Sequence, residues 1–228
     1  MKILALEFSS PQRSVAVVDA IGNAPPSPLP PALSEVVETG SLRANALGMI
    51  DAALRQAQVE REQIECLAVG LGPGSYHGIR LAIAVAQGWQ FAAGQDRVKL
   101  LGISSAECIA SQARDDGRLG ALTVVIDAQR GEFYVATYDL TPQGCAEIQP
   151  LQITTQADLL RRQRMGETLV GPDVSHRLDA VRKVFPRAAT LGRLAIGRSD
   201  FIPGEKLTPI YLRETNFVKA LPLRVLPQ

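Results

Sequence analysis

The sequence CLAVGLGPGSYHGIRLAIAVAQGWQFAA, residues 66–93, joins a short apolar run to a glycine-rich turn and then to a long helical pattern. Residues 66–71 have the length and the apolar composition of a buried strand. The turn GPGS, residues 72–75, follows, and we expect a helix over residues 76–93. A strand that leads through a tight turn into a helix is typical of α/β domains, in which the helix packs on the sheet.

The turn has a geometry that suits anion binding, because a helix N-terminus offers free N–H groups and a positive dipole end. Gly72, Gly74 and Ser75 lie in the turn, and Arg80 lies about one turn into the helix. The lysine of a Walker loop is absent, and the spacing does not match the dinucleotide fingerprint. From this chemistry alone, glycines that permit a tight turn explain the motif better than a phosphate cradle does.

The helix over residues 76–93 carries two apolar stripes. The first contains Ile79, Ala82, Ile83 and Ala86, and the second contains Leu81, Ala84, Val85, Gly88, Trp89 and Ala92. A surface helix of a monomer shows one such stripe, so we expect this helix to be buried on both sides. One side faces the chain's own sheet, and the other faces either a third layer of the same chain or a partner protein.

A second apolar helix, expected over residues 41–57, is suited to lie beside the first. The two helices together predict an interface patch for a partner. Its candidate residues are Leu42, Ala46, Met49, Ile50, Ala53, Arg80, Leu81, Ala84, Val85 and Gly88.

The rest of the chain alternates strands and helices, which predicts two related α/β lobes. We place the N-terminal lobe, with the partner-binding helices, at residues 1–102 and the C-terminal lobe at residues 103–228. Further strands are expected at residues 3–8, 14–18, 33–38, 98–101, 122–126, 132–138 and 169–170. Further helices are expected from Ser104, with Glu107 at capping-box spacing, and at residues 155–164 and 174–185. The proline-rich stretch at residues 24–31 is expected to be an exposed loop.

The composition limits the classes of function that the chain can have. The 228 residues are 46% hydrophobic, so a sizeable core can form, and the net charge of +1 lacks the basic excess of a protein that grips nucleic acid alone. Any RNA is therefore expected to be held by a partner. The cysteines at positions 66, 108 and 145 are far apart and are expected to be buried reduced thiols. No apolar run suits a signal peptide or a membrane span, so we expect a soluble cytoplasmic protein.

Six stretches in this order and spacing resemble the bacterial TsaB (YeaZ) family, which serves threonylcarbamoyladenosine biosynthesis on tRNA. They are ILALEFS (3–9), GLGPGSYHGIR (70–80), AVAQG (84–88), ISSAE (103–107), IDAQRGEFY (126–134) and PIYLR (209–213). The resemblance implies an actin-like (ASKHA, RNase H-like) fold of two lobes, with mixed sheets flanked by helices.

The resemblance also implies a role. TsaB is a paralogue of TsaD, which transfers the threonylcarbamoyl group to the adenosine beside the anticodon, and TsaB lacks that chemistry. The family member docks TsaD through the two helices above, the ATPase TsaE joins them, and TsaB without TsaD forms a homodimer through the same surface. The resemblance implies that contact with tRNA is indirect and that no cofactor is needed. It leaves open whether an adenine nucleotide binds at the partner interface.

This sequence departs from the family pattern at several positions. Glu7 stands where Asp is usual, His77 where Thr is usual, and Gln87 where Lys is usual. Residues 41–45 lack the His-Ser expected there. These departures predict a divergent member whose partner surface matches its own partner.

An independent enzyme of this fold would place carboxylates at strand ends beside a metal ion. Glu7 and Asp127 each end an expected strand and could face one cleft. The candidates near a nucleotide are Glu7, Ser9, Gly72, Gly74, Ser75 and Asp127. We favour structural roles, with Asp127 forming the turn before Gly131. The two histidines, His77 and His176, fall in different lobes, which predicts no metal site. The alternative left open is a free-standing actin-like ATPase or phosphotransferase.

Overall fold

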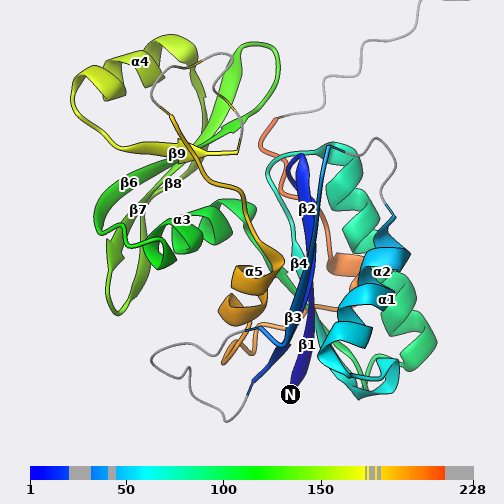
Figure 1. Cartoon of the computed structure of the whole chain (residues 1–228). Coiled ribbons are helices and arrows are strands. Elements are labelled where there is room, and N and C mark those ends of the chain that lie inside the picture. Colours follow the sequence, from blue (N-terminus) through cyan, green and yellow to red (C-terminus); the bar gives the residue numbers. More distant parts are fainter. Residues whose placement is uncertain (21–31, 41–44, 173, 175–177, 179–180, 214–228) are drawn as a thin grey trace, which may run out of the picture.

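The computed structural model describes residues 1–20, 32–40, 45–172, 174, 178 and 181–213. The proline-rich stretch, Leu42 and His176 lie outside these residues. The described chain forms two five-stranded mixed sheets with helices packed on them, as the sequence predicted (Figure 1). Among the described residues, no helix has both the length and the apolar character that crossing a membrane requires.

The first sheet has the strand order β3-β2-β1-β4-β5. Its strands are β1 (Lys2–Glu7), β2 (Gln12–Asp19), β3 (Ser34–Thr39), β4 (Ile64–Gly70) and β5 (Lys99–Ile103). Strands β1, β2 and β3 form an antiparallel meander, whereas β4 and β5 run parallel to β1. Residues 3–6 of the central strand β1 are all apolar and buried, as expected for a strand that is covered on both faces.

Helices lie on both faces of this sheet, with α1 (Ala46–Ala57) and α2 (Tyr76–Ala93) on one side and α5 (Ala188–Leu194) on the other (Figure 1). Alternate residues of β1 point to opposite faces. Leu4 and Leu6 therefore join the core beneath α1 and α2, while Ile3 and Ala5 join the core beneath α5.

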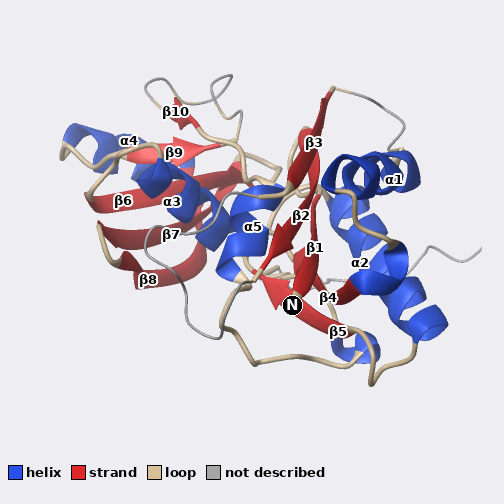
Figure 2. Cartoon of the chain, turned by 60° about the horizontal axis from the view of Figure 1, so that its bottom comes forward, coloured by secondary structure: helices blue, strands red, loops and turns tan. Residues whose placement is uncertain are grey.

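The second sheet has the order β10-β9-β6-β7-β8 (Figure 2). Its strands are β6 (Gly120–Asp127), β7 (Glu132–Thr141), β8 (Gly144–Thr155), β9 (Leu169–Gly171) and β10 (Arg182–Lys183). Helix α3 (Ser105–Asp115) packs on one face through Ala106, Ile109 and Ala110. Leu159 of α4 (Gln156–Arg164) packs with Phe133 in the core of the other face.

The chain returns to the first lobe after the second sheet, which differs from the division expected at residues 102 and 103. Ile202 N donates to Leu100 O at 3.0 Å, and Ile210 N donates to Leu71 O at 2.9 Å. Between them, the short helix η2 (Gly204–Lys206) contacts α2, where Gln87 Nε2 donates to Gly204 O at 2.8 Å. Residues 188–210 thus complete the first lobe, and Gln87 has a structural partner there.

Two local expectations need correction, and one strand was not predicted. The unpredicted strand is the edge strand β8, residues 144–155, whose mostly exposed residues carry no apolar alternation. The helix expected over residues 174–185 is wrong at residues 182–183, which form β10. Val174 and Leu178, which are four residues apart, join the core beside α4. Ser104 caps α3 as predicted, but Glu107 pairs with Arg198 at 3.4 Å instead of completing a capping box.

Candidate functional site

The turn at residues 72–75 connects the end of β1 with the starts of α2 and α3. Gly72 O accepts from Ser105 N at 2.8 Å, and Gly72 N donates to the Ser105 hydroxyl at 3.2 Å. Ser75 N donates to Ser9 O at 2.6 Å, so the start of α2 is joined to the end of β1. Gly74 has a φ of 147°, and a Cβ there would lie 2.1 Å from Ser9 O. The glycines therefore permit close packing, as the chemistry of the sequence favoured.

Glu7 is fully buried beneath this turn, which corrects its place among the candidates near a nucleotide. Its Oε1 accepts from Ser9 N at 2.8 Å, and its Oε2 accepts from the Ser105 hydroxyl at 2.9 Å. A Cβ at Gly70 would lie 2.1 Å from Oε2, so only a glycine leaves room for the carboxyl group. Burial raises the pKa of Glu7 above its ordinary value, although the hydrogen bonds from Ser9 and Ser105 oppose this rise. The carboxyl group joins β1 to α3 inside the core.

A cleft of about 700 Å³ lies where the two sheets meet, and it receives only some of the predicted residues. Ser9, Gly74, Ser75 and Asp127 line it, whereas Glu7 and Gly72 are buried behind it. Three tyrosines also line it: Tyr76, Tyr134 and Tyr211. The pair of strand-end carboxylates that catalysis would require is therefore not assembled, because one member is sealed in the core.

Asp127 has the turn-forming role that the sequence favoured. Its Oδ1 accepts from Gln129 N at 2.7 Å, and the turn places Gln129 and Arg130 at φ values of 63° and 56°. An Asp side chain that binds the backbone two residues later stabilises such a turn. Asp127 thus lines the cleft while holding the loop between β6 and β7.

Glu7→Gln should stabilise the protein at neutral pH. Because the pKa of Glu7 in the folded state lies above its ordinary value of 4.5, the native chain keeps this proton to a higher pH than the unfolded chain does. The stabilisation that protonated Glu7 contributes is fully present below pH 4.5. It is lost as the pH rises through the pKa of Glu7 in the folded state. The amide has no charge to desolvate, so we expect a gain on the order of 1 kcal/mol in the free energy of unfolding at pH 7.5.

Urea unfolding at pH 5 and pH 7.5 measures this effect. The difference between Glu7→Gln and the parent chain should be larger at pH 7.5. Glu205→Gln, which changes an exposed glutamate, controls for the loss of one negative charge. Equal effects of Glu7→Gln at both pH values would show that the carboxyl group does not titrate in this range.

The face of α1 and α2 divides into an inner and an outer set of residues. Four predicted interface residues of α1 are corrected to core positions, because their side chains point toward the sheet beneath: Ala46, Met49, Ile50 and Ala53. On α2, the first stripe is likewise buried. The second stripe faces outward, with Arg80, Ala84 and Gly88 exposed and Leu81 and Val85 half-buried. Ala84 and Gly88 are the open part of this stripe, because both are exposed and no described atom lies within 4 Å of a Cβ built at Gly88.

A groove of about 520 Å³ runs along the outer stripe. Its apolar lining includes Leu47 of α1 together with Ala84, Val85 and Trp89 of α2. Leu47 is 73% exposed, and Phe91 near the end of α2 is 91% exposed. Neither was among the predicted interface residues, although a large apolar side chain off the buried stripe is a signal for an interface.

Charged residues border this groove. Arg61, Glu62 and Arg97 line one end, and the Arg61 guanidinium lies 5.7 Å from the centre of the Trp89 ring. Such a contact holds an arginine over an aromatic face. An apolar strip with charged groups at its edge is the usual anatomy of a protein interface.

The other residues that could take part in catalysis or metal binding do not come together in one site. His77 is exposed at the start of α2 and contacts the Tyr76 ring edge-on, with the ring centres 5.6 Å apart. The three cysteines are free; Cys66 and Cys108 are buried as predicted and Cys145 is partly buried. Burial raises the pKa of Cys66 to about 12. In the described part of the chain, no three metal-ligating side chains form a cluster.

Comparison with known proteins agrees with this architecture. The family model described as "TsaD: tRNA N6-adenosine threonylcarbamoyltransferase" matches residues 40–175, which is more than half of the chain. The chain belongs to this family. Its relatives place it with the TsaB (YeaZ) members. The Escherichia coli tRNA threonylcarbamoyladenosine biosynthesis protein TsaB is 27% identical over 195 residues, 77% of this chain and 82% of the relative.

Other TsaB and YeaZ proteins show the same relationship. TsaB of Bacillus subtilis is 23% identical over 155 residues, 66% of this chain and 65% of the relative. The crystal structure of YeaZ from Pseudomonas aeruginosa has a TM-score of 0.72 at 23% identity and covers 92% of this chain and 99% of that one. A second Pseudomonas aeruginosa structure, described as similar to peptidase YeaZ, has a TM-score of 0.74 at 24% identity, covering 93% and 99%. These two structures confirm the expected fold.

Proposed function

We propose that this chain is a non-catalytic subunit that docks a TsaD-like threonylcarbamoyltransferase for modification of the adenosine beside the tRNA anticodon. The observation that carries the proposal is the apolar groove along the outer stripe of α2, which is lined by Leu47 of α1 and by Val85 and Trp89 of α2. The names of the relatives and of the family model supply the pathway and the type of partner.

The shape of the face supports a helical partner. Ala84 and Gly88 are small and exposed, so another helix can approach the backbone of α2 closely. Leu47 of α1 and Phe91, which lies on the same face of α2 as Ala84 and Gly88, offer larger exposed apolar side chains. A partner with two apolar helices of its own, such as a paralogue of this chain, would fit this surface. The same argument proposes a homodimer when the partner is absent.

The sealed position of Glu7 supports a role without chemistry. A phosphotransferase of this fold needs carboxylates in the cleft. Among the described residues, Asp127 is the one carboxylate that lines it, and it also holds a turn. We propose that a TsaE-like ATPase supplies nucleotide hydrolysis and that the cytoplasm is where these subunits meet.

Mixing the purified chain with its own TsaD-like subunit and measuring complex mass by light scattering tests the proposal. We expect a stoichiometric complex to replace the free chains at micromolar concentrations. ATP hydrolysis is measured in parallel for the chain alone and for the mixture with both partners. Absence of a complex would contradict the docking role, and hydrolysis by the chain alone that Asp127→Ala abolishes would instead favour the ATPase.

A further inference from the structure

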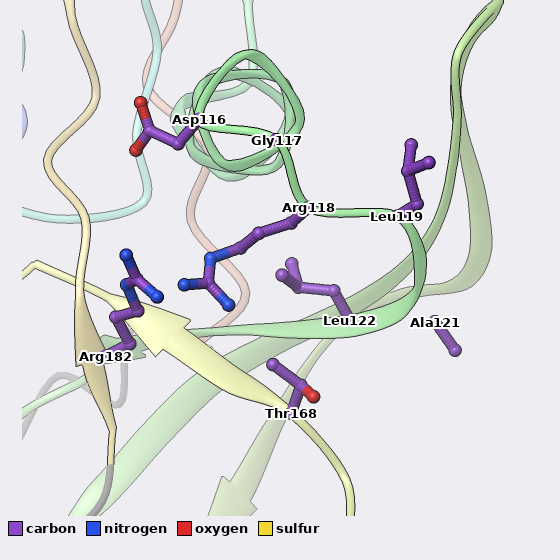
Figure 3. Close-up of a pocket in the computed structure, with 8 residues that line it drawn as sticks. All are labelled: Asp116, Gly117, Arg118, Leu119, Ala121, Leu122, Thr168 and Arg182. Carbon is purple, nitrogen blue, oxygen red and sulfur yellow. The ribbon is translucent and has the colours of Figure 1, made fainter.

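A polar pocket of about 330 Å³ lies in the second lobe, beside the C-terminal end of α3 (Figure 3). Arg118 and Arg182 line it from two separate elements, the turn after α3 and strand β10. Figure 3 shows their guanidinium groups pointing into the same space. The pocket is on the opposite lobe from the docking face, and the proposed function makes no use of it.

The backbone holds Arg118 in place. Gly117, at a φ of 85°, ends α3, and Arg118 N donates to Ala113 O at 3.1 Å. Gly117 N donates to Arg114 O at 2.8 Å. These bonds occupy carbonyl groups at the end of α3 with backbone donors. The Arg118 guanidinium is therefore free to serve the pocket instead of the helix end.

Within the described part of the chain, the two arginines have no anionic partner. Arg118 Nε is buried and has no hydrogen-bond partner. Among the described residues, no carboxylate pairs with Arg118 or Arg182, although nearby arginines are paired, as Arg114 is with Asp115 at 2.9 Å. Asp116 stands at the rim, where its Oδ1 accepts from Gln112 Nε2 at 3.3 Å. Two cations that face one space repel each other unless an anion lies between them. The unsatisfied Nε–H belongs to one of these two guanidinium groups.

We propose that Arg118 and Arg182 form a binding site for a phosphate group. A guanidinium fork pairs with two oxygens of an anion. One fork satisfies a carboxylate, whereas forks that approach from two elements require an anion with more oxygens. A tetrahedral phosphate meets that requirement, and the Thr168 hydroxyl in the lining is a further donor. The phosphate comes either from an RNA backbone or from a free phosphate.

The test follows the Arg118 Nε–H signal in ¹H–¹⁵N spectra of the full-length chain at constant ionic strength. One arm adds inorganic phosphate, and the other adds an RNA anticodon stem-loop. We expect the signal to shift to saturation in at least one arm. A shift with RNA, competed by excess phosphate, identifies an RNA phosphodiester as the source, and a shift with inorganic phosphate alone identifies a free phosphate.

Substitutions connect the shift to the pocket. Arg182→Gln changes an exposed edge residue and should keep the fold while weakening binding about ten-fold or more. Arg118→Gln should remove the signal and weaken binding to a similar extent. Arg164→Gln, an exposed arginine of α4, is the matched control for charge and should change binding less than about two-fold.

Two results would overturn the site. One is an Arg118 signal that neither ligand moves, and the other is binding by the chain with both Arg118→Gln and Arg182→Gln that is as tight as that of the parent chain. Light scattering with the TsaD-like subunit separates this outcome from failure of the docking role. Arg182→Gln should leave that complex intact because the pocket and the groove share no residues.

Discussion

Ala84→Arg should lower the affinity of the chain for its TsaD-like subunit by about 100-fold or more while leaving the fold intact. Ala84 is exposed on the outer stripe of α2 and lines the apolar groove, so the free chain tolerates the new side chain in water. In the complex, the guanidinium would be buried without a counter-charge, which costs about 3 kcal/mol or more. Titration calorimetry with the purified partner measures the loss, and thermal unfolding of the free chain checks the fold.

Val85→Glu provides a second variant with the opposite charge at the same groove. Gln143→Arg, in the turn between β7 and β8, adds the same charge as Ala84→Arg at an exposed site on the other lobe. We expect it to bind the partner as the parent chain does. Normal binding by both groove variants would mean that the partner uses another surface.

Gly78→Ala should be the most destabilising small substitution in α2. A Cβ at Gly78 would lie 1.9 Å from Phe8 O, inside van der Waals contact with the backbone after β1. Neither element can yield easily, because β1 is the central strand and Ser75 N already donates to Ser9 O. We expect a loss of about 3 kcal/mol or more in the free energy of unfolding, measured by urea denaturation.

Gly88→Ala is the matched control in the same helix. Nothing lies within 4 Å of the Cβ that it would add, and the position is exposed. Alanine forms helices better than glycine, so this change should raise stability by about 1 kcal/mol. If Gly78→Ala and Gly88→Ala had effects of the same sign and size, the contact between α2 and the end of β1 would not be limiting.

The first lobe was largely predictable from its sequence. Apolar runs of strand length identified β1, β2 and β4, and the glycine turn at residues 72–75 located the start of α2. These features depend only on residues that are adjacent in the sequence, so they can be identified without knowing the tertiary contacts. The two-residue strand β10 and the seven-residue helix α5 are too short for periodicity to reveal them. Their positions depend on strands and helices that precede them by many residues.

The sequence by itself determined that α2 has two apolar stripes and that Asp127 forms a turn, because helical spacing and turn chemistry are properties of neighbouring residues. Only the tertiary structure decided which stripe lies against the sheet and that Met49 and Ile50 of α1 belong to the core. It also decided that Glu7 is sealed by Ser105, a residue 98 positions away. Periodicity shows which side chains share a face, but burial depends on what covers that face, and here the covering groups come from distant parts of the chain.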